Sequence, residues 1–117
     1  MKATSAIAAL VIAILGSGTA YAVTMPTLYE EALAHKEEAH IIAQPIAGIA
    51  NKYWFNYQVG VVEAKKELAS DLHRADDTGD LRDAWGEYAH ELRHERRHYI
   101  KKMAKRGYRV GEVYLDR

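Results

Sequence analysis

The sequence predicts an all-α protein, a small antiparallel bundle of about three helices that follows a cleaved N-terminal signal peptide. Apolar residues recur at three- and four-residue steps through most of the chain after residue 27, which is typical of amphipathic helices. Only residues 110–115 have strand-like composition, and no second run is available to pair with them. The 117 residues include no cysteine, so one small domain must be stable without disulfides.

The first 22 residues have the layout of a secretory signal peptide. Lys2 precedes an uncharged apolar run at residues 6–15, and Ala20-Tyr21-Ala22 matches the small-residue cleavage pattern. Cleavage after Ala22 leaves residues 23–117 as the helical domain, in the periplasm or outside the cell. Residues 3–23 carry no charge, so the alternative is an uncleaved segment that tethers the protein to the inner membrane.

The first helix is expected at about residues 28–43. Thr27 and Glu30 have the spacing of a capping box, which predicts a helix start. The apolar stripe that follows includes His35, which we expect to be partly buried, whereas Glu37 falls on the polar side. Pro45 cannot continue a helix, so the first helix ends before it.

The second helix is expected at about residues 46–74, with Pro45 at its start. Its first half is apolar on two sides, because Phe55, Val59 and Val62 point away from the main stripe. This second stripe must contact either another helix or another chain. An isolated three-helix unit and a homodimer fit the pattern equally well.

An aromatic cluster lies at the start of the second helix and consists of Tyr53, Trp54, Phe55 and Tyr57. Such a cluster most often packs in a core. Tyrosine and tryptophan are also common at protein interfaces, so binding of a protein partner through these residues is the alternative.

Three histidines recur every fourth residue in the third helix, which is expected at about residues 81–106. His90, His94 and His98 lie on the side opposite the apolar stripe, together with Glu87. Neighbouring histidines can share one ion, but all three cannot. Imidazole and carboxylate ligands without thiolate suit zinc or another divalent transition metal. Two further histidines could complete the set from elsewhere, as could a second chain: His40 and His73.

Residues 90–94, His-Glu-Leu-Arg-His, resemble the zinc-binding motif of zincin metallopeptidases. The resemblance implies a miniature zinc peptidase in which His90 and His94 bind zinc and Glu91 acts as the catalytic base. It covers five residues, and Arg93 departs from it, because zincins have uncharged residues at this position of a buried helix. Downstream, only two carboxylates are available as a third ligand: Glu112 and Asp116.

A cationic patch accompanies the histidines and consists of Arg93, Arg96, Arg97, Lys101, Lys102, Lys105, Arg106 and Arg109. It suits an acidic protein surface or anionic lipid headgroups, whereas solvation and pairing with neighbouring glutamates is the simpler alternative. Sixteen basic and sixteen acidic residues give no net charge, so nucleic acid is not an expected partner.

These features favour an exported accessory protein that binds a transition metal or a protein partner through a histidine-rich, basic helix face. Arg93 and Arg97 are the basic residues most directly interleaved with the histidines. Two alternatives remain open, the miniature zinc peptidase and a metal-independent interaction or inhibitor module of the cell envelope.

Overall fold

A computed structural model describes residues 27–109 and contains three α-helices and one short 3-10 turn. The elements are α1 (Tyr29–Glu38), η1 (Ile46–Gly48), α2 (Lys52–Arg74) and α3 (Thr78–Ala104). No strand occurs within residues 27–109, so the predicted all-α bundle is confirmed there. The predicted signal peptide, residues 1–22, and the predicted tail beyond residue 109 lie outside the described residues.

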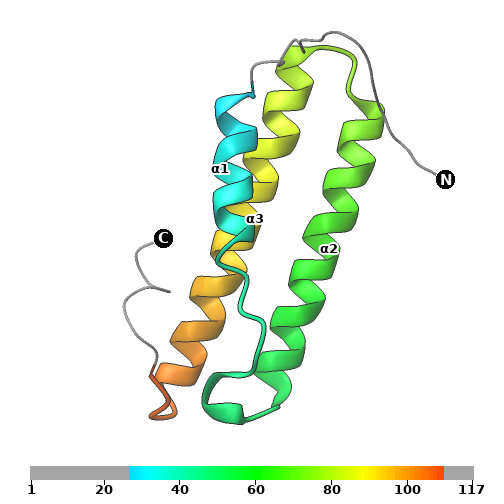
Figure 1. Ribbon diagram of the computed structural model, residues 1–117. Coiled ribbons are helices and arrows are strands. Elements are labelled where there is room, and N and C mark those ends of the chain that lie inside the picture. Colours follow the sequence, from blue (N-terminus) through cyan, green and yellow to red (C-terminus); the bar gives the residue numbers. More distant parts are fainter. Residues whose placement is uncertain (1–26, 110–117) are drawn as a thin grey trace, which may run out of the picture.

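Helix α3 is the central element of the bundle. Helix α2 runs antiparallel to it over most of its length, and α1 runs beside the N-terminal part of α3 in the same direction (Figure 1). With 10 residues, α1 is much shorter than the 27-residue α3. Residues 39–51 therefore pass along the rest of the bundle without forming an α-helix (Figure 1).

The first two helices are shorter than expected, because a turn separates them. Pro45 does not begin α2 but precedes a single 3-10 turn, in which Ala47 and Gly48 have φ values of 58° and 71°. These left-handed conformations cannot continue an α-helix. Helix α2 instead begins after Asn51, whose side-chain oxygen accepts hydrogen bonds from the backbone N–H groups of Tyr53 and Trp54, both at 3.1 Å.

The expected N-terminal cap of α1 and the expected start of α3 were also wrong. Leu28 occupies the N-cap position of α1 and makes no side-chain capping bond, so Thr27 and Glu30 do not form the expected capping box. Asp77 caps α3 by accepting a hydrogen bond of 2.8 Å from the Asp80 N–H. Helix α3 therefore starts at Thr78, one turn earlier than expected.

Three aromatic rings pack together in the core between α2 and α3; Tyr57 stacks on Tyr99, and Trp54 is tilted against both. Trp54 and Tyr57 of α2 lie 5.7 Å and 5.1 Å from Tyr99 of α3, measured between ring centroids. The Tyr57 hydroxyl accepts a hydrogen bond of 2.8 Å from the Ile42 N–H, and the Tyr99 hydroxyl accepts one of 2.9 Å from the Ile46 N–H. These bonds satisfy buried backbone donors and fix the non-helical connection against both long helices.

A buried ion pair joins α1 to α3. The guanidinium of Arg96 donates to the carboxylate of Glu37 at 2.5 Å, and the two side chains are 1% and 4% exposed. The expectation that Glu37 lies on the polar side and Arg96 in a surface patch was therefore wrong. A buried ion requires a partner of opposite charge. Arg96 and Glu37 provide this partner for each other.

Candidate functional site

The strongest candidate site is an exposed row of basic side chains along α3, which we call the histidine face. It consists of His90, Arg93, His94, Arg97, His98 and Lys101, all of which are exposed. The opposite side of α3 enters the core through Leu92, Tyr99 and Met103, so helical geometry alone turns the histidines outward. These six residues line one open hollow.

The three histidines are stacked along the helix. The ring centroids of His90 and His94 are 6.4 Å apart, and those of His94 and His98 are 6.1 Å apart, with the ring planes tilted by only 17° and 20°. A zinc ion sits about 2.0–2.1 Å from each ligand nitrogen. Small side-chain rotations would therefore let either neighbouring pair hold one ion, with His94 common to both pairs.

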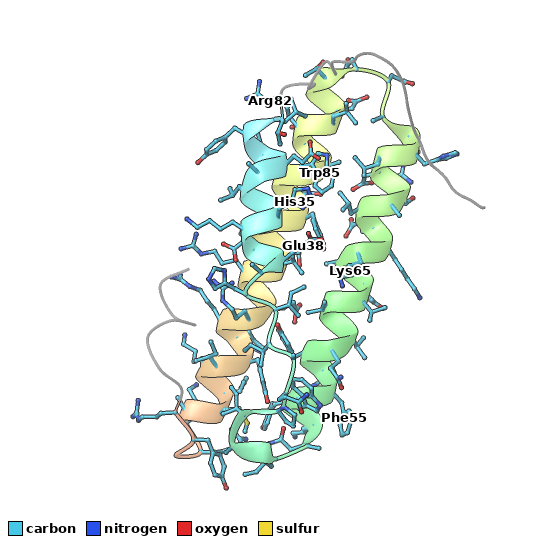
Figure 2. The ribbon with its side chains drawn as sticks, viewed as in Figure 1. His35, Glu38, Phe55, Lys65, Arg82 and Trp85 are labelled. Carbon is cyan, nitrogen blue, oxygen red and sulfur yellow. The ribbon has the colours of Figure 1, made fainter. Side chains whose placement is uncertain are left out.

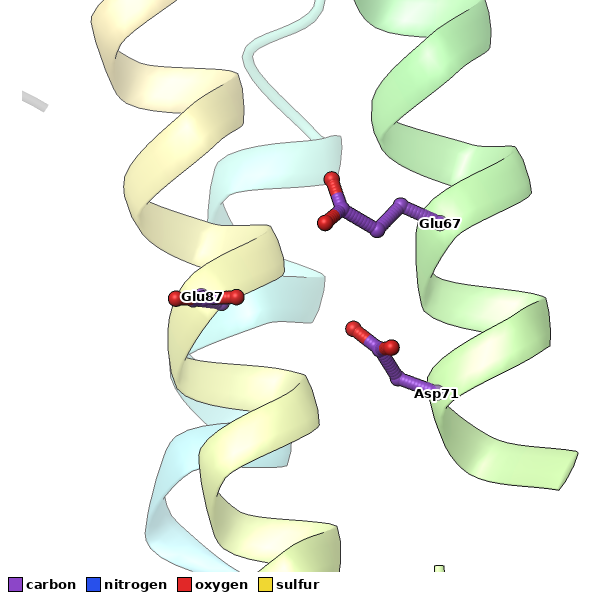
Figure 3. Close-up of side chains that lie close together, drawn as sticks. All are labelled: Glu67, Asp71 and Glu87. Carbon is purple, nitrogen blue, oxygen red and sulfur yellow. The ribbon is translucent and has the colours of Figure 1, made fainter. Parts of the chain in front are cut away.

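Glu87 forms no group of three or more candidate ligands with the histidines among residues 27–109. Its carboxylate lies with those of Glu67 and Asp71 from α2, where ligand oxygens of the three residues are within 4.8 Å of one another (Figure 3). Among residues 27–109 this is the one group of three or more candidate ligands, and it contains no histidine. Asp71 also forms an ion pair with Arg74.

The arrangement within residues 27–109 does not include the three-ligand set that a zinc peptidase requires. His90 and His94 lie on the outward side, and Glu91 is half-buried beside them. Neither His40 nor His73 joins them in a three-ligand group in that part of the chain. The two downstream carboxylates proposed from sequence lie outside the described residues: Glu112 and Asp116.

Two cations of the histidine face, Arg93 and Lys101, form no ion pair with another residue of the described part of the chain. Ion pairs there involve the cations Arg74, Arg82 and Arg96 and the imidazole of His35. Neither Arg93 nor Lys101 belongs to an ion pair between described residues, although acidic residues are plentiful in the sequence. The outward side of α3 is therefore a concentrated source of positive potential.

The aromatic cluster divides between core and surface. Trp54 and Tyr57 are buried, while Tyr53 is half-buried beneath the guanidinium of Arg106, which lies 4.1 Å from the ring centroid. Arg106 of the predicted cationic patch therefore contacts α2 within the same chain. Phe55 is 52% exposed and lies on α2 (Figure 2), so it is the residue of the cluster that remains accessible to a partner.

Sequence reasoning missed a polar network between α1 and α3 (Figure 2). Glu38 accepts hydrogen bonds of 2.6 Å from the Tyr88 hydroxyl and 2.9 Å from His35 Nδ1. Burial raises the pKa of Glu38, but these hydrogen bonds and the positive charges of His35 and Lys65 outweigh it, so the pKa lies below its ordinary value. The hydrogen bond to Glu38 raises the pKa of His35, and burial raises that of Tyr88.

The sequence gives only a weak indication of this network. His35 and Glu38 are three residues apart, as side chains on one helix face are, yet Tyr88 reaches them only through the packing of α1 on α3. His35 also packs against Trp85 with ring centroids 5.3 Å apart, although half of its side chain is exposed. The network therefore fixes α1 on α3.

No protein-family model, curated protein or solved structure gives a significant match to this chain. Within the helices of residues 27–109, none combines the length and the apolar composition that crossing a membrane requires. The class of protein defined by the fold is a small helical bundle with one strongly basic helix face.

Proposed function

We propose that this protein is an exported accessory protein that binds an acidic protein partner through the histidine face of α3. The observation that carries the proposal is the continuous, exposed row of imidazole, guanidinium and ammonium groups on one helix, in which Arg93 and Lys101 have no ion-pair partner among the described residues. Export through the predicted signal peptide is part of the same proposal.

The geometry of α3 supports this function. At 1.5 Å per residue, the span from His90 to Lys101 presents charges over about 16 Å of a rigid helix. Arginine side chains form bidentate bonds with carboxylates, and a helix fixes their relative positions, so a partner with a row of carboxylates fits this face. Electrostatic attraction of this kind also accelerates association.

Retention on immobilised poly-L-glutamate tests the proposal. We expect the purified protein to bind in low salt and the double variant Arg93→Glu, Lys101→Glu to lose most of this retention. The double variant Lys36→Glu, Lys66→Glu is the matched control, because it changes the net charge equally at exposed sites on α1 and α2. Equal loss in both variants would show a general charge effect and would refute a specific face.

A transition metal is the second candidate ligand, favoured by the ring spacing of the histidine pairs. Calorimetric titration of tag-free protein with Zn²⁺ tests it. Because His94 belongs to both pairs, His94→Ala should abolish binding, whereas His73→Ala on α2 should not change it. Unchanged affinity in His94→Ala would exclude the histidine face as the metal site.

A further inference from the structure

A second surface with a different chemistry lies on the outward side of α2, and we call it the α2 stripe. It consists of Phe55, Val59 and Val62, which are 52%, 56% and 49% exposed. They are four and three residues apart, so they form one row on the helix. The core side of α2 is formed by other residues, including Tyr57, Val61 and Ala64.

The charges beside the α2 stripe fit a second copy of the same helix. Lys52 and Glu63 flank the stripe on the same side, because at about 100° per residue they lie about 60° and 80° around the helix axis from Phe55. Both are exposed, and neither belongs to an ion pair among the described residues. The Lys52 ammonium lies 5.3 Å from the Tyr53 ring centroid.

A two-fold axis perpendicular to α2, at the level of Gln58, makes this surface self-complementary. In an antiparallel pair of α2 helices, Phe55 of one copy then lies between Val59 and Val62 of the other. The same axis sets Lys52 of each copy opposite Glu63 of its mate, to within about one helical rise of 1.5 Å. Two apolar contacts and two ion pairs are thereby repeated by symmetry, as an isologous interface requires.

We propose that the protein forms a homodimer through the α2 stripe, with the two α2 helices antiparallel and both reciprocal Lys52–Glu63 pairs along one edge of the interface. Three exposed apolar side chains per copy make a small interface, and small interfaces dissociate at moderate concentration. The dimer is therefore a weak and reversible one. It leaves the histidine face on α3 free, so it does not depend on the proposed function.

Sedimentation velocity over a series of protein concentrations tests the homodimer. We expect concentration-dependent dimerisation of the natural chain, and an affinity loss of about tenfold or more in Lys52→Glu and in Glu63→Lys, because each places like charges in contact. The double variant Lys52→Glu, Glu63→Lys should dimerise again. An equimolar mixture of the two single variants should also recover dimer, because both of its cross-chain pairs are complementary.

Lys36→Glu on α1 is the control and should leave the dimer unchanged. Circular dichroism melts should show that both single variants remain folded, since the altered side chains are exposed. A natural chain that stays monomeric up to near-millimolar concentration would overturn the proposal. So would single variants that dimerise normally, or a double variant that fails to recover, since either result would exclude the reciprocal pairs.

Discussion

The Arg96–Glu37 pair is the most consequential contact at the scale of single residues, because both charges are almost wholly removed from water. We expect Arg96→Met to lower the free energy of unfolding by about 3–5 kcal/mol, since it leaves the Glu37 carboxylate buried without its partner. Urea denaturation measures this loss. The double variant Arg96→Met, Glu37→Leu should recover part of it, and a double variant less stable than Arg96→Met would contradict this account.

The Tyr57 hydroxyl has a structural role that its ring does not reveal. Tyr57→Phe keeps the aromatic stacking but removes the acceptor for the buried Ile42 N–H. We expect a loss of about 1–3 kcal/mol in the free energy of unfolding, the typical cost of an unsatisfied buried donor. Tyr53→Phe is the matched control and should cost less, because the Tyr53 hydroxyl bonds to Arg106 at an exposed site.

His35 should make stability depend on pH. Its pKa in the folded state is raised above 6.5 by Glu38, so its stabilising effect is complete below that value and is lost as the pH rises through the folded-state pKa. The lowered pKa of Glu38 adds stability that is lost only in acid. We expect melting temperatures to fall as the pH rises above about 6.5, and to fall less in His35→Gln. Equal slopes in the two proteins would refute the role of His35.

At the scale of elements, the start of α2 depends on Asn51. Its side-chain oxygen caps two backbone N–H groups, and its amide also donates to the Met103 sulfur at 3.3 Å. Asn51→Ala should therefore lower the free energy of unfolding by about 0.5–2 kcal/mol, measured by thermal melts followed at 222 nm. Asn56→Ala, inside the same helix and exposed, should have a much smaller effect.

Helix types were predictable from periodicity, whereas helix ends were not. The apolar rhythm of α2 and α3 is long and regular, so both helices were expected near their observed positions. The region of Asp76, Asp77 and Asp80 offers several residues able to cap α3, and sequence alone does not rank them. The turn at Ala47 could not be foreseen either, because a non-glycine residue rarely adopts positive φ and the surrounding packing fixes this conformation.

At the scale of the whole molecule, the outward position of the histidine face was predictable because it depends only on helical spacing. The contents of the α1–α3 interface were not, since Glu37 and Arg96 are both strongly polar and their burial depends on each other. The position of Glu87 was not predictable either. Its grouping with Glu67 and Asp71 arises from the packing of α2 on α3, which no pattern within one helix reports.

Basic side chains of α3 form two groups, one between the helices and one on the exposed histidine face. Two arginines of α3 are paired with glutamates of α1, in Arg82–Glu30 and Arg96–Glu37, so they contribute to the fold. The histidine face contributes little to packing within the described residues. Variants at the exposed residues Arg93 and Lys101 should therefore retain the melting temperature of the natural chain.

Nuclear magnetic resonance mapping shows directly whether the outward side of α3 is the surface that binds an acidic partner. In ¹H–¹⁵N correlation spectra recorded during titration with soluble poly-L-glutamate, the largest shift changes should occur at residues 90–101 and should disappear as salt is added. Shift changes centred on α1 or on the α2 stripe, or none at any concentration of the polymer, would contradict the account.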